Sequence, residues 1–390
     1  MGDYLREFWV PAVRAVNVKP GGDPVQVRVL GVDVVVFRGA DGSLGCVDEK
    51  CPHRRASLSL AKNDGDRLTC LYHGWQFGTD GRCVDVPTEP ADKRAAFAAR
   101  VQVNRHPVAE SSGMIWVYLG DPDNPPPLPD FQFNSLPADR VCAVVGISDV
   151  NWLQCLEGLT DTVHVGQLHQ AWLPSTVNQL GDVAVESAPT METVNTDYGL
   201  RSCGDRPKPD GTHYIRVTEY VAPFWSFIPH GPKEDRATIG IVPIDDTHTM
   251  QWYVWYDDTA PLQEGTDVAA IFEPLRENPD DFTAPLRGKP KWGQDRAAMG
   301  GDHFSGLPSL VLEDVAVQES QGVVMDRTKE LLGSSDQFVM RTRRLLMKAA
   351  RGHQETGAVF PDPRATPLRN VRSLATDIAE GEDWKATPTR

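Results

Sequence analysis

The chain has few of the features that mark a membrane protein or a nucleic-acid-binding protein. Its longest apolar runs, such as residues 32–37, are strand-sized, well below the ~20 apolar residues of a membrane-spanning helix. The opening residues MGDYLREFW lack the apolar core expected of a signal peptide. There is no basic run and the net charge is −15, so we expect neither nucleic acid nor a membrane as a partner.

The chain does contain enough apolar sequence for more than one globular core. Apolar residues make up 40% of its 390 residues, and this length favours two domains. The stretch GDPDNPPPLPDF at residues 120–131 is too rich in proline to continue a sheet interior, so it predicts a linker. We therefore expect one domain over residues 8–120 and a second over residues 121–390, with residues 1–7 packing on the second.

Two cysteines and two histidines stand out in the segment CPHRRASLSLAKNDGDRLTCLYHGWQF. Cys51 and His53 are separated by one residue, and Cys70 and His73 by two. Tetrahedral zinc sites of the Cys₂His₂ kind usually pair like with like, whereas each pair here mixes the two residue types. A chance arrangement is improbable, because the chain has only seven Cys and ten His. In a Rieske [2Fe–2S] centre two Cys bind one iron and two His the other, which fits this pattern.

The other cysteines show no paired framework. They are five in number, an odd count that does not suit a disulfide scaffold: Cys46, Cys83, Cys142, Cys155 and Cys203. Unpaired thiols together with an iron–sulfur centre favour a reducing compartment, and we expect a cytoplasmic protein.

Short alternating apolar segments predict that the first domain is all-β. The expected strands and hairpin are PVQVRV, VDVVVF, SLGCV, FGTDGRCVDV and IWVYLG. Beyond the linker, long alternating segments mix with helical ones, and the expected helices cover residues 151–170, 311–322 and 334–352. The second domain is therefore predicted to be α+β, an antiparallel sheet wrapped by helices. Residues 357–390 show little periodicity.

A second set of metal-ligating residue types lies in the helical segment 151–170. His164 and Asp161 share one face with Glu157, because their spacing is i, i+4, i+7. His169 is five residues beyond His164, about 140° away on an ideal helix. The helix must break or bulge for both His to reach one metal, and Gly166 between them permits such a distortion.

Two imidazoles and one carboxylate make the facial triad that binds Fe(II) and leaves positions open for O₂. Asp161 is one turn from His164, which also suits a carboxylate that accepts the other ring N–H of a ligating His. The third ligand is then expected from a downstream acid. The candidates are Glu313, Asp314, Glu319 and Asp326, and spacing alone leaves Glu313 and Asp314 open.

The chain resembles the oxygenase component of the Rieske non-haem iron oxygenases. CPH…CLYHGWQF is similar to the cluster loops of that family, and NWLQCLEGLTDTVHVGQLH to its mononuclear-iron segment. Within the family the resemblance is greatest to the phthalate 4,5-dioxygenase group, carried by MGDYLREFWVPA, GLTDTVHVGQLH and EDVAVQESQGVVMDRTKELLGSSD. The likeness covers nearly the whole chain. It departs at Gly158, where many ring-hydroxylating dioxygenases have Asn.

The resemblance implies a role for each of these residues. It implies a Rieske cluster held by Cys51, His53, Cys70 and His73, and a mononuclear Fe(II) held by His164, His169 and Asp314. It implies that Asp161 is a catalytic residue that links this iron to the cluster of a neighbouring subunit, through the neighbour's copy of His73. The second domain is expected to have the helix-grip (START-like) fold.

The resemblance also implies the partners. We expect a homotrimer or homohexamer, and a reductase that carries a flavin and a plant-type [2Fe–2S] centre and draws on NAD(P)H. O₂ is the co-substrate and a small aromatic molecule, carboxylated in our expectation, is the substrate. Hydroxylation with one or two oxygen atoms and O- or N-demethylation are all compatible with such a scaffold.

The sequence only outlines a substrate pocket. Phe224, Trp225 and Phe227 are candidates to line it, and Arg201 and Arg216 to pair with a carboxylate. Two other classes of function compete with an oxygenase. One is an electron carrier, which would bind two irons per chain rather than three. The other is a ligand-binding helix-grip module, which would consume no O₂.

Overall fold

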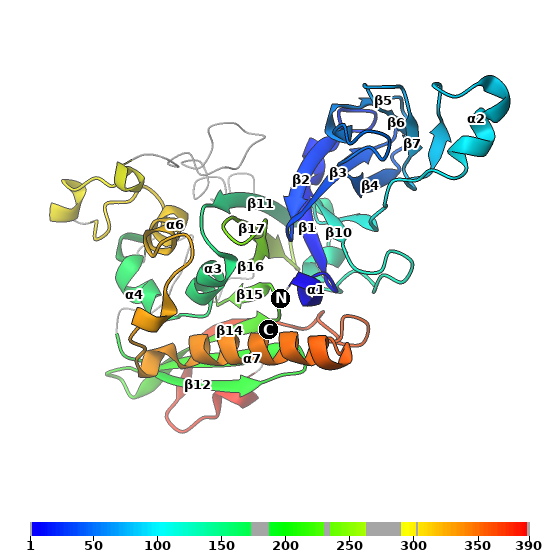
Figure 1. The fold of residues 1–390 in the computed structure, drawn as a ribbon. Coiled ribbons are helices and arrows are strands. Elements are labelled where there is room, and N and C mark those ends of the chain that lie inside the picture. The colour runs from blue at the N-terminus through cyan, green and yellow to red at the C-terminus, as the bar shows by residue number, and fades with distance from the viewer. Residues whose placement is uncertain (1, 173–186, 230–234, 263–289, 302, 388–390) are drawn as a thin grey trace. The chain divides into compact units, whose positions relative to one another are not determined.

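A computed structural model of the chain describes most of its length as two compact units, residues 1–129 and 130–390 (Figure 1). The described residues are 2–172, 187–229, 235–262, 290–301 and 303–387. Residues 1, 173–186, 230–234, 263–289, 302 and 388–390 lie outside this description. No helix within the described ranges is both long enough and apolar enough to cross a membrane.

The boundary between the units falls later than the sequence predicted, and residues 1–7 are counted with the first unit instead of the second. The indole N–H of Trp9 donates to the backbone oxygen of Pro126 at 2.8 Å, which ties the proline-rich segment to the first unit. The carboxylate of Glu7 accepts a hydrogen bond from the Tyr118 hydroxyl at 3.2 Å in the same unit.

The first unit is built from three small antiparallel sheets, as its alternating segments predict. One sheet has the order β1-β10-β9, a second β2-β3-β4 and a third β5-β6-β7-β8. The strand bounds are β1 Trp9–Arg14, β2 Val25–Val29, β3 Val32–Arg38, β4 Leu44–Asp48, β5 Lys62–Asn63, β6 Arg67–Thr69, β7 Gln76–Gly78, β8 Cys83–Asp85, β9 Val108–Ser111 and β10 Met114–Tyr118. The unit also contains two α-helices, α1 (Gly2–Leu5) and α2 (Ala91–Ala98).

The second unit is organised around one eight-stranded antiparallel sheet. Its strand order is β11-β17-β16-β15-β14-β13-β12, and β18 pairs with β14 off this path. The strands are β11 Val141–Ser148, β12 Thr190–Asn195, β13 Gly199–Pro207, β14 Thr212–Val221, β15 Trp225–Ile228, β16 Asp235–Pro243, β17 Thr249–Asp257 and β18 Leu374–Ala379. The α+β expectation is confirmed, but β18 lies in the segment whose weak periodicity predicted no strand.

Helices pack on one face of this sheet and so define a helix face. They are α3 Trp152–Leu159, α4 His164–Leu168, α6 Leu310–Ser320 and α7 Gln337–Thr356. Tyr253 and Trp255 of β17 pack against apolar residues of α6, and Ser226 of β15 donates to the Leu159 oxygen at the end of α3. Because side chains alternate along a strand, these contacts identify which residues point to the helix face and which point away.

Candidate metal centres

Two loops of the first unit share one hydrogen-bonding pattern. The backbone N–H of Cys51 donates to the oxygen of Ala56, and the Cys51 oxygen accepts from Arg55. Cys70 repeats both bonds with the oxygen of Trp75 and the N–H of Gly74. The fourth residue after each Cys has positive φ, 60° at Arg55 and 74° at Gly74. This backbone conformation reverses the direction of the chain and closes each loop.

The loops bring the four expected cluster residues together. The rings of His53 and His73 lie 4.5 Å apart between centroids, and Trp75 stacks on His53 at 4.3 Å. Burial raises the pKa of the Cys51 thiol to about 11, and the adjacent Cys70 adds to the rise. Partial burial, helped by His53 and Arg54, lowers the pKa of His73 and favours the neutral ring that binds metal.

The donor set fits a Rieske cluster. Both thiols are buried in the core of the unit, while the ring nitrogen Nδ1 of His53 is buried and has no hydrogen-bond partner within the described part of the chain. A buried ring nitrogen without a partner is costly unless a ligand takes it up. Two sulfur and two imidazole donors on facing loops are what the two irons of such a cluster require.

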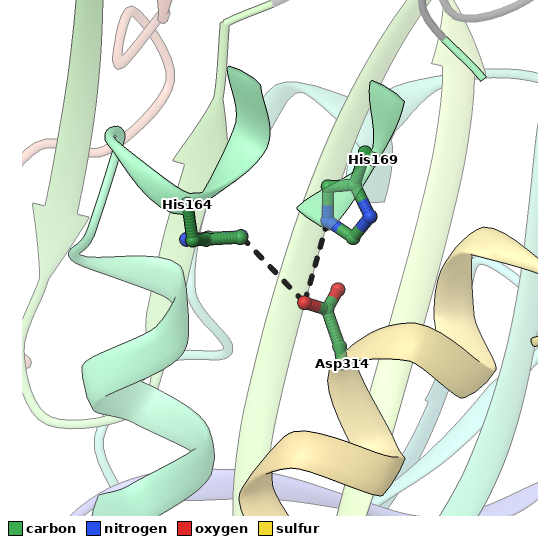
Figure 2. Close-up of side chains that lie close together, drawn as sticks. All are labelled: His164, His169 and Asp314. Atoms are coloured by element: carbon green, nitrogen blue, oxygen red, sulfur yellow. Dashed lines mark ion pairs between the residues drawn. The ribbon is translucent and has the colours of Figure 1, made fainter. Parts of the chain in front are cut away.

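In the second unit three side chains converge on one point (Figure 2). Oδ1 of Asp314 lies 3.6 Å from Nε2 of His164 and 3.4 Å from Nε2 of His169. One donor atom from each residue lies within 4.8 Å of the others. Two imidazoles and a single carboxylate at this spacing match the donor set of a facial triad for Fe(II).

A break in the helical segment delivers the two histidines, but it is not at Gly166. Helix α3 ends at Leu159, and α4 begins afresh at His164 and includes Gly166. The carboxylate of Asp161 accepts a hydrogen bond from the N–H of Val163 at 2.8 Å, a local turn that competes with continued helix. His164 and His169 therefore stand at the two ends of the short α4, which lets both reach Asp314.

The charges at this centre compensate one another. Burial alone would lower the pKa of His169, but the charges of Asp314 and Glu313 and their hydrogen bonds outweigh it and raise that pKa to about 9. Burial likewise acts to raise the pKa of Asp314, and the two imidazoles outweigh it, so the pKa of Asp314 is lowered. Such strong coupling is typical of groups gathered around a metal.

Asp161 lies behind His164 rather than beside the third ligand. Its Oδ2 is 3.4 Å from Nδ1 of His164, the ring nitrogen that faces away from Asp314. Burial acts to raise the pKa of Asp161, but its interactions with His164 prevail and lower it. The side chain of Asp161 keeps 31% of its surface exposed.

The structure separates the acids that spacing left open. Glu313 contacts the opposite nitrogen of the His169 ring, with Oε2 at 2.6 Å from Nδ1. Glu319 accepts hydrogen bonds from the Asp149 backbone and the Trp292 indole. Asp326 accepts a bond at the start of a short 3-10 helix. Of these four candidates, Asp314 is the one whose carboxylate lies within 4 Å of both histidines.

Three of the residues expected to line the substrate pocket face away from the metal site. Arg201 forms an ion pair with Glu219 at 2.9 Å on the opposite face of the sheet and lies over the ring of Trp384. Trp225 and Phe227 point to that same opposite face. There they pack with aromatic rings from the start of the unit: Phe131 and Phe133. The sequence could not reveal this, because strand periodicity does not say which face is which.

Arg216 does lie on the helix face, in the same alternation as Tyr214, which packs against Val165 of α4. Its side chain is only 1% exposed. A second arginine, Arg206, is equally buried on the neighbouring strand and donates to the backbone oxygen of Thr162, two residues before His164. Arg206 is not among the residues that the sequence singles out, because its neighbours Asp205 and Pro207 give no apolar alternation that would mark a buried position.

Phe224, the remaining pocket candidate, is buried with its ring 6.4 Å from that of Trp152 at the start of α3.

Comparison with known proteins agrees with this architecture. Residues 8–106 match the Rieske [2Fe–2S] domain model, and residues 117–390 match the model described as LigXa C-terminal domain like. The oxygenase subunit of 3-chlorobenzoate-3,4-dioxygenase from Comamonas testosteroni is 33% identical over 93% of this chain and 87% of its own. That of phthalate 4,5-dioxygenase from Pseudomonas putida is 32% identical over 99% and 90%.

Two further similar proteins catalyse other reactions. The oxygenase subunit of 5,5'-dehydrodivanillate O-demethylase from a Sphingobium species is 28% identical over 98% of this chain and 85% of its own. Dicamba monooxygenase bound to dicamba has the same fold, with a TM-score of 0.63 at 20% identity over 90% of this chain and 99% of its own.

A Rieske domain joined to a catalytic domain with a mononuclear-iron donor set defines a terminal oxygenase. The chain belongs to the Rieske non-haem iron oxygenases, as an oxygenase component of the phthalate 4,5-dioxygenase group. Its cofactors are accordingly the Rieske [2Fe–2S] cluster and a mononuclear iron, with O₂ as co-substrate.

Proposed function

We propose that this enzyme hydroxylates the ring of an aromatic carboxylate. The observation that carries the proposal is a pair of buried arginines, Arg206 and Arg216, on the sheet face that also receives the metal-site helices. A guanidinium binds a carboxylate through two parallel hydrogen bonds, so an arginine on this face suits an anionic substrate. The two most similar relatives named above are oxygenases of a chlorobenzoate and of phthalate, both aromatic carboxylates.

In this proposal the cluster is held by Cys51, Cys70, His53 and His73. The iron is held by His164, His169 and Asp314. The two cofactors together supply electrons one at a time and activate O₂. Asp314 contributes the single anionic donor, and its lowered pKa keeps it ionised at neutral pH.

The protein residues orient the substrate and exclude water. Arg216 would bind the carboxylate and so direct the ring toward the metal site. Tyr253, whose hydroxyl donates to Gln251 at 3.0 Å, is buried on the same face, and burial followed by the charge of Asp314 raises its pKa, so it remains neutral. Burial of these side chains keeps water away from this part of the helix face.

We also propose that electrons pass between subunits of a ring, a homotrimer or two stacked trimers. Both units expose large apolar side chains. In the first unit these are Leu71 and Tyr72, which lie between Cys70 and His73 in the sequence, and in the second they are Val324 and Leu331, which follow α6. Where exposed apolar groups gather in a contiguous patch they form contact surfaces, and we propose that these side chains contribute to the contact between subunits. Asp161 would then accept a hydrogen bond from the neighbouring subunit's cluster histidine.

The remaining partner is a reductase, which we expect to carry a flavin and a plant-type [2Fe–2S] centre and to draw on NAD(P)H. We place the system in the cytoplasm. None of the seven cysteines, all of which lie in the described part of the chain, forms a disulfide, which suits a reducing compartment.

The substrate test is O₂ uptake with NADH and a generic reductase against matched pairs of aromatic acids and their amides. We expect turnover of acids only. Arg216→Met should lower kcat/KM for the acid by about 10–100-fold, the value of a charge-assisted hydrogen bond of roughly 1.5–3 kcal/mol, while Arg216→Lys should lose less. Equal turnover of acid and amide by the wild type would refute a carboxylated substrate.

Demethylation is the second candidate, favoured by the likeness to an O-demethylase subunit over nearly the full chain. Methoxybenzoates in the same panel separate the two reactions. Formaldehyde released in proportion to the O₂ consumed identifies a demethylase, whereas a hydroxylated ring that keeps its methoxy group identifies a hydroxylase.

A further inference from the structure

The acid next to the expected iron ligand is completely buried and points elsewhere. The side chain of Glu313 has 0% of its surface exposed. Its Oε2 lies 2.6 Å from Nδ1 of His169, while the other nitrogen of that ring faces Asp314. Adjacent residues of α6 thus reach the two opposite edges of one imidazole.

The second oxygen of Glu313 is also occupied. The hydroxyl of Ser305, itself buried, donates to Oε1, and the Ser305 oxygen in turn accepts a hydrogen bond from the N–H of Leu307 at 3.1 Å. Since an N–H supplies the bond to the hydroxyl oxygen, the hydroxyl hydrogen remains for the carboxylate. A buried carboxylate is tolerated only when its oxygens are satisfied in this way.

This geometry determines which nitrogen of the neutral His169 ring carries the proton. An ionised carboxylate is an acceptor only, so the proton between Glu313 and His169 must be on Nδ1. In the neutral ring Nε2 then carries a lone pair, and it is the nitrogen that faces Asp314. The negative charge of Glu313 also makes this lone pair more basic.

We infer that Glu313 is a positioning residue for His169, held by Ser305, which fixes the Nε2-binding tautomer and adds negative charge to the metal site. The inference rests on the proposed metal site. It differs from ordinary packing of a buried acid because it requires the carboxylate charge and not merely the side-chain volume. Replacing groups that hydrogen-bond a metal-binding His typically weakens metal binding by about 10–100-fold.

The test uses Glu313→Gln in the full-length protein with its cluster in place, after chelation of the mononuclear iron. Co(II) is the probe, because the oxidised cluster gives no EPR signal and bound Co(II) does. We expect Co(II) affinity to fall about 10–100-fold and the EPR signal of the residual complex to shift, with the visible absorption of the cluster unchanged. Ser305→Ala should weaken binding in the same direction by a smaller factor.

Glu319→Gln is the matched control. Glu319 lies on the same helix and accepts two hydrogen bonds, but from the Asp149 backbone and the Trp292 indole instead of a metal-site residue. It should bind Co(II) with wild-type affinity and spectrum. If Glu313→Gln behaves like this control, the positioning role is refuted.

A third variant separates this inference from the site on which it rests. His169→Ala should abolish Co(II) binding at the site. If His169→Ala still binds Co(II) as the wild type does, the proposed metal site itself is wrong. If His169→Ala loses the metal while Glu313→Gln retains wild-type affinity and spectrum, only the inference about Glu313 fails.

Discussion

Arg343 of α7 binds two carboxylates, one on α3 and one in the segment that precedes α7. Replacing Arg343 by Met removes this connection. Its Nε lies 2.7 Å from Oε1 of Glu157 on α3, and its two Nη atoms lie 2.5 and 2.7 Å from the oxygens of Glu330. The three side chains keep only 16%, 10% and 17% of their surface exposed. Hydrogen bonds to Glu330 first, and then to Glu157, raise the pKa of Arg343 despite its burial.

The magnitude follows from what remains after the change. Removing one partner of a buried ion pair costs about 3–5 kcal/mol, because the other charge stays buried without compensation. Glu157 retains Arg327 at 3.0 Å, but Glu330 loses its bidentate partner. We therefore expect Arg343→Met to lower the free energy of unfolding of the second unit by about 3 kcal/mol, the low end of that range.

Scanning calorimetry of the full-length holoenzyme measures the effect. For a unit of this size 3 kcal/mol corresponds to a midpoint lower by roughly 6–12 °C. Lys348→Met on the exposed side of α7 is the control and should shift the midpoint little. The double change Arg343→Met with Glu330→Gln should recover part of the loss, since no unpaired carboxylate is left at Glu330. A midpoint within 2 °C of the control would refute the reasoning.

Three further outcomes are expected. His164→Ala should retain the visible absorption of the cluster but lose one of about three irons per chain, and turnover with it. Iron analysis and O₂ uptake measure these effects, and an unchanged iron content would show that His164 does not bind the iron. Asp161→Asn should keep both metals and the assembly but stop reoxidation of a pre-reduced cluster when substrate and O₂ are added, and a wild-type rate in that single-turnover experiment would exclude its bridging role. Burial raises the pKa of Glu219 to about 7, against the opposing effects of Tyr198 and Arg201. The folded state therefore binds this proton more tightly, and its stabilising contribution is present below pH ~4.5 and lost as pH rises through 7. In urea unfolding, the free energy of unfolding of Glu219→Gln should rise relative to that of the wild type by up to about 3 kcal/mol between pH 5 and pH 8. A difference between the two proteins that does not change with pH would contradict this.

The sequence by itself determined the parts of this protein that depend on local order. The loops with Cys51 and Cys70 are short, and each closes through hydrogen bonds between residues four and five apart, so sequence spacing alone defines them. The helix from Gln337 to Thr356 and the long strands follow from periodicity, which the sequence carries directly. These elements, with the paired His and Cys, were sufficient for the family and the fold class.

Tertiary structure decided which of the candidate side chains meet. Glu313 and Asp314 are adjacent in sequence, and only the direction of α6 relative to α4 places one on each edge of the His169 ring. Arg201 and Arg216 occupy neighbouring strands, yet they point to opposite faces, one toward Glu219 and the other toward the helices. A period of two tells which residues share a face, but the face that becomes the site is selected by helices packed from distant parts of the chain.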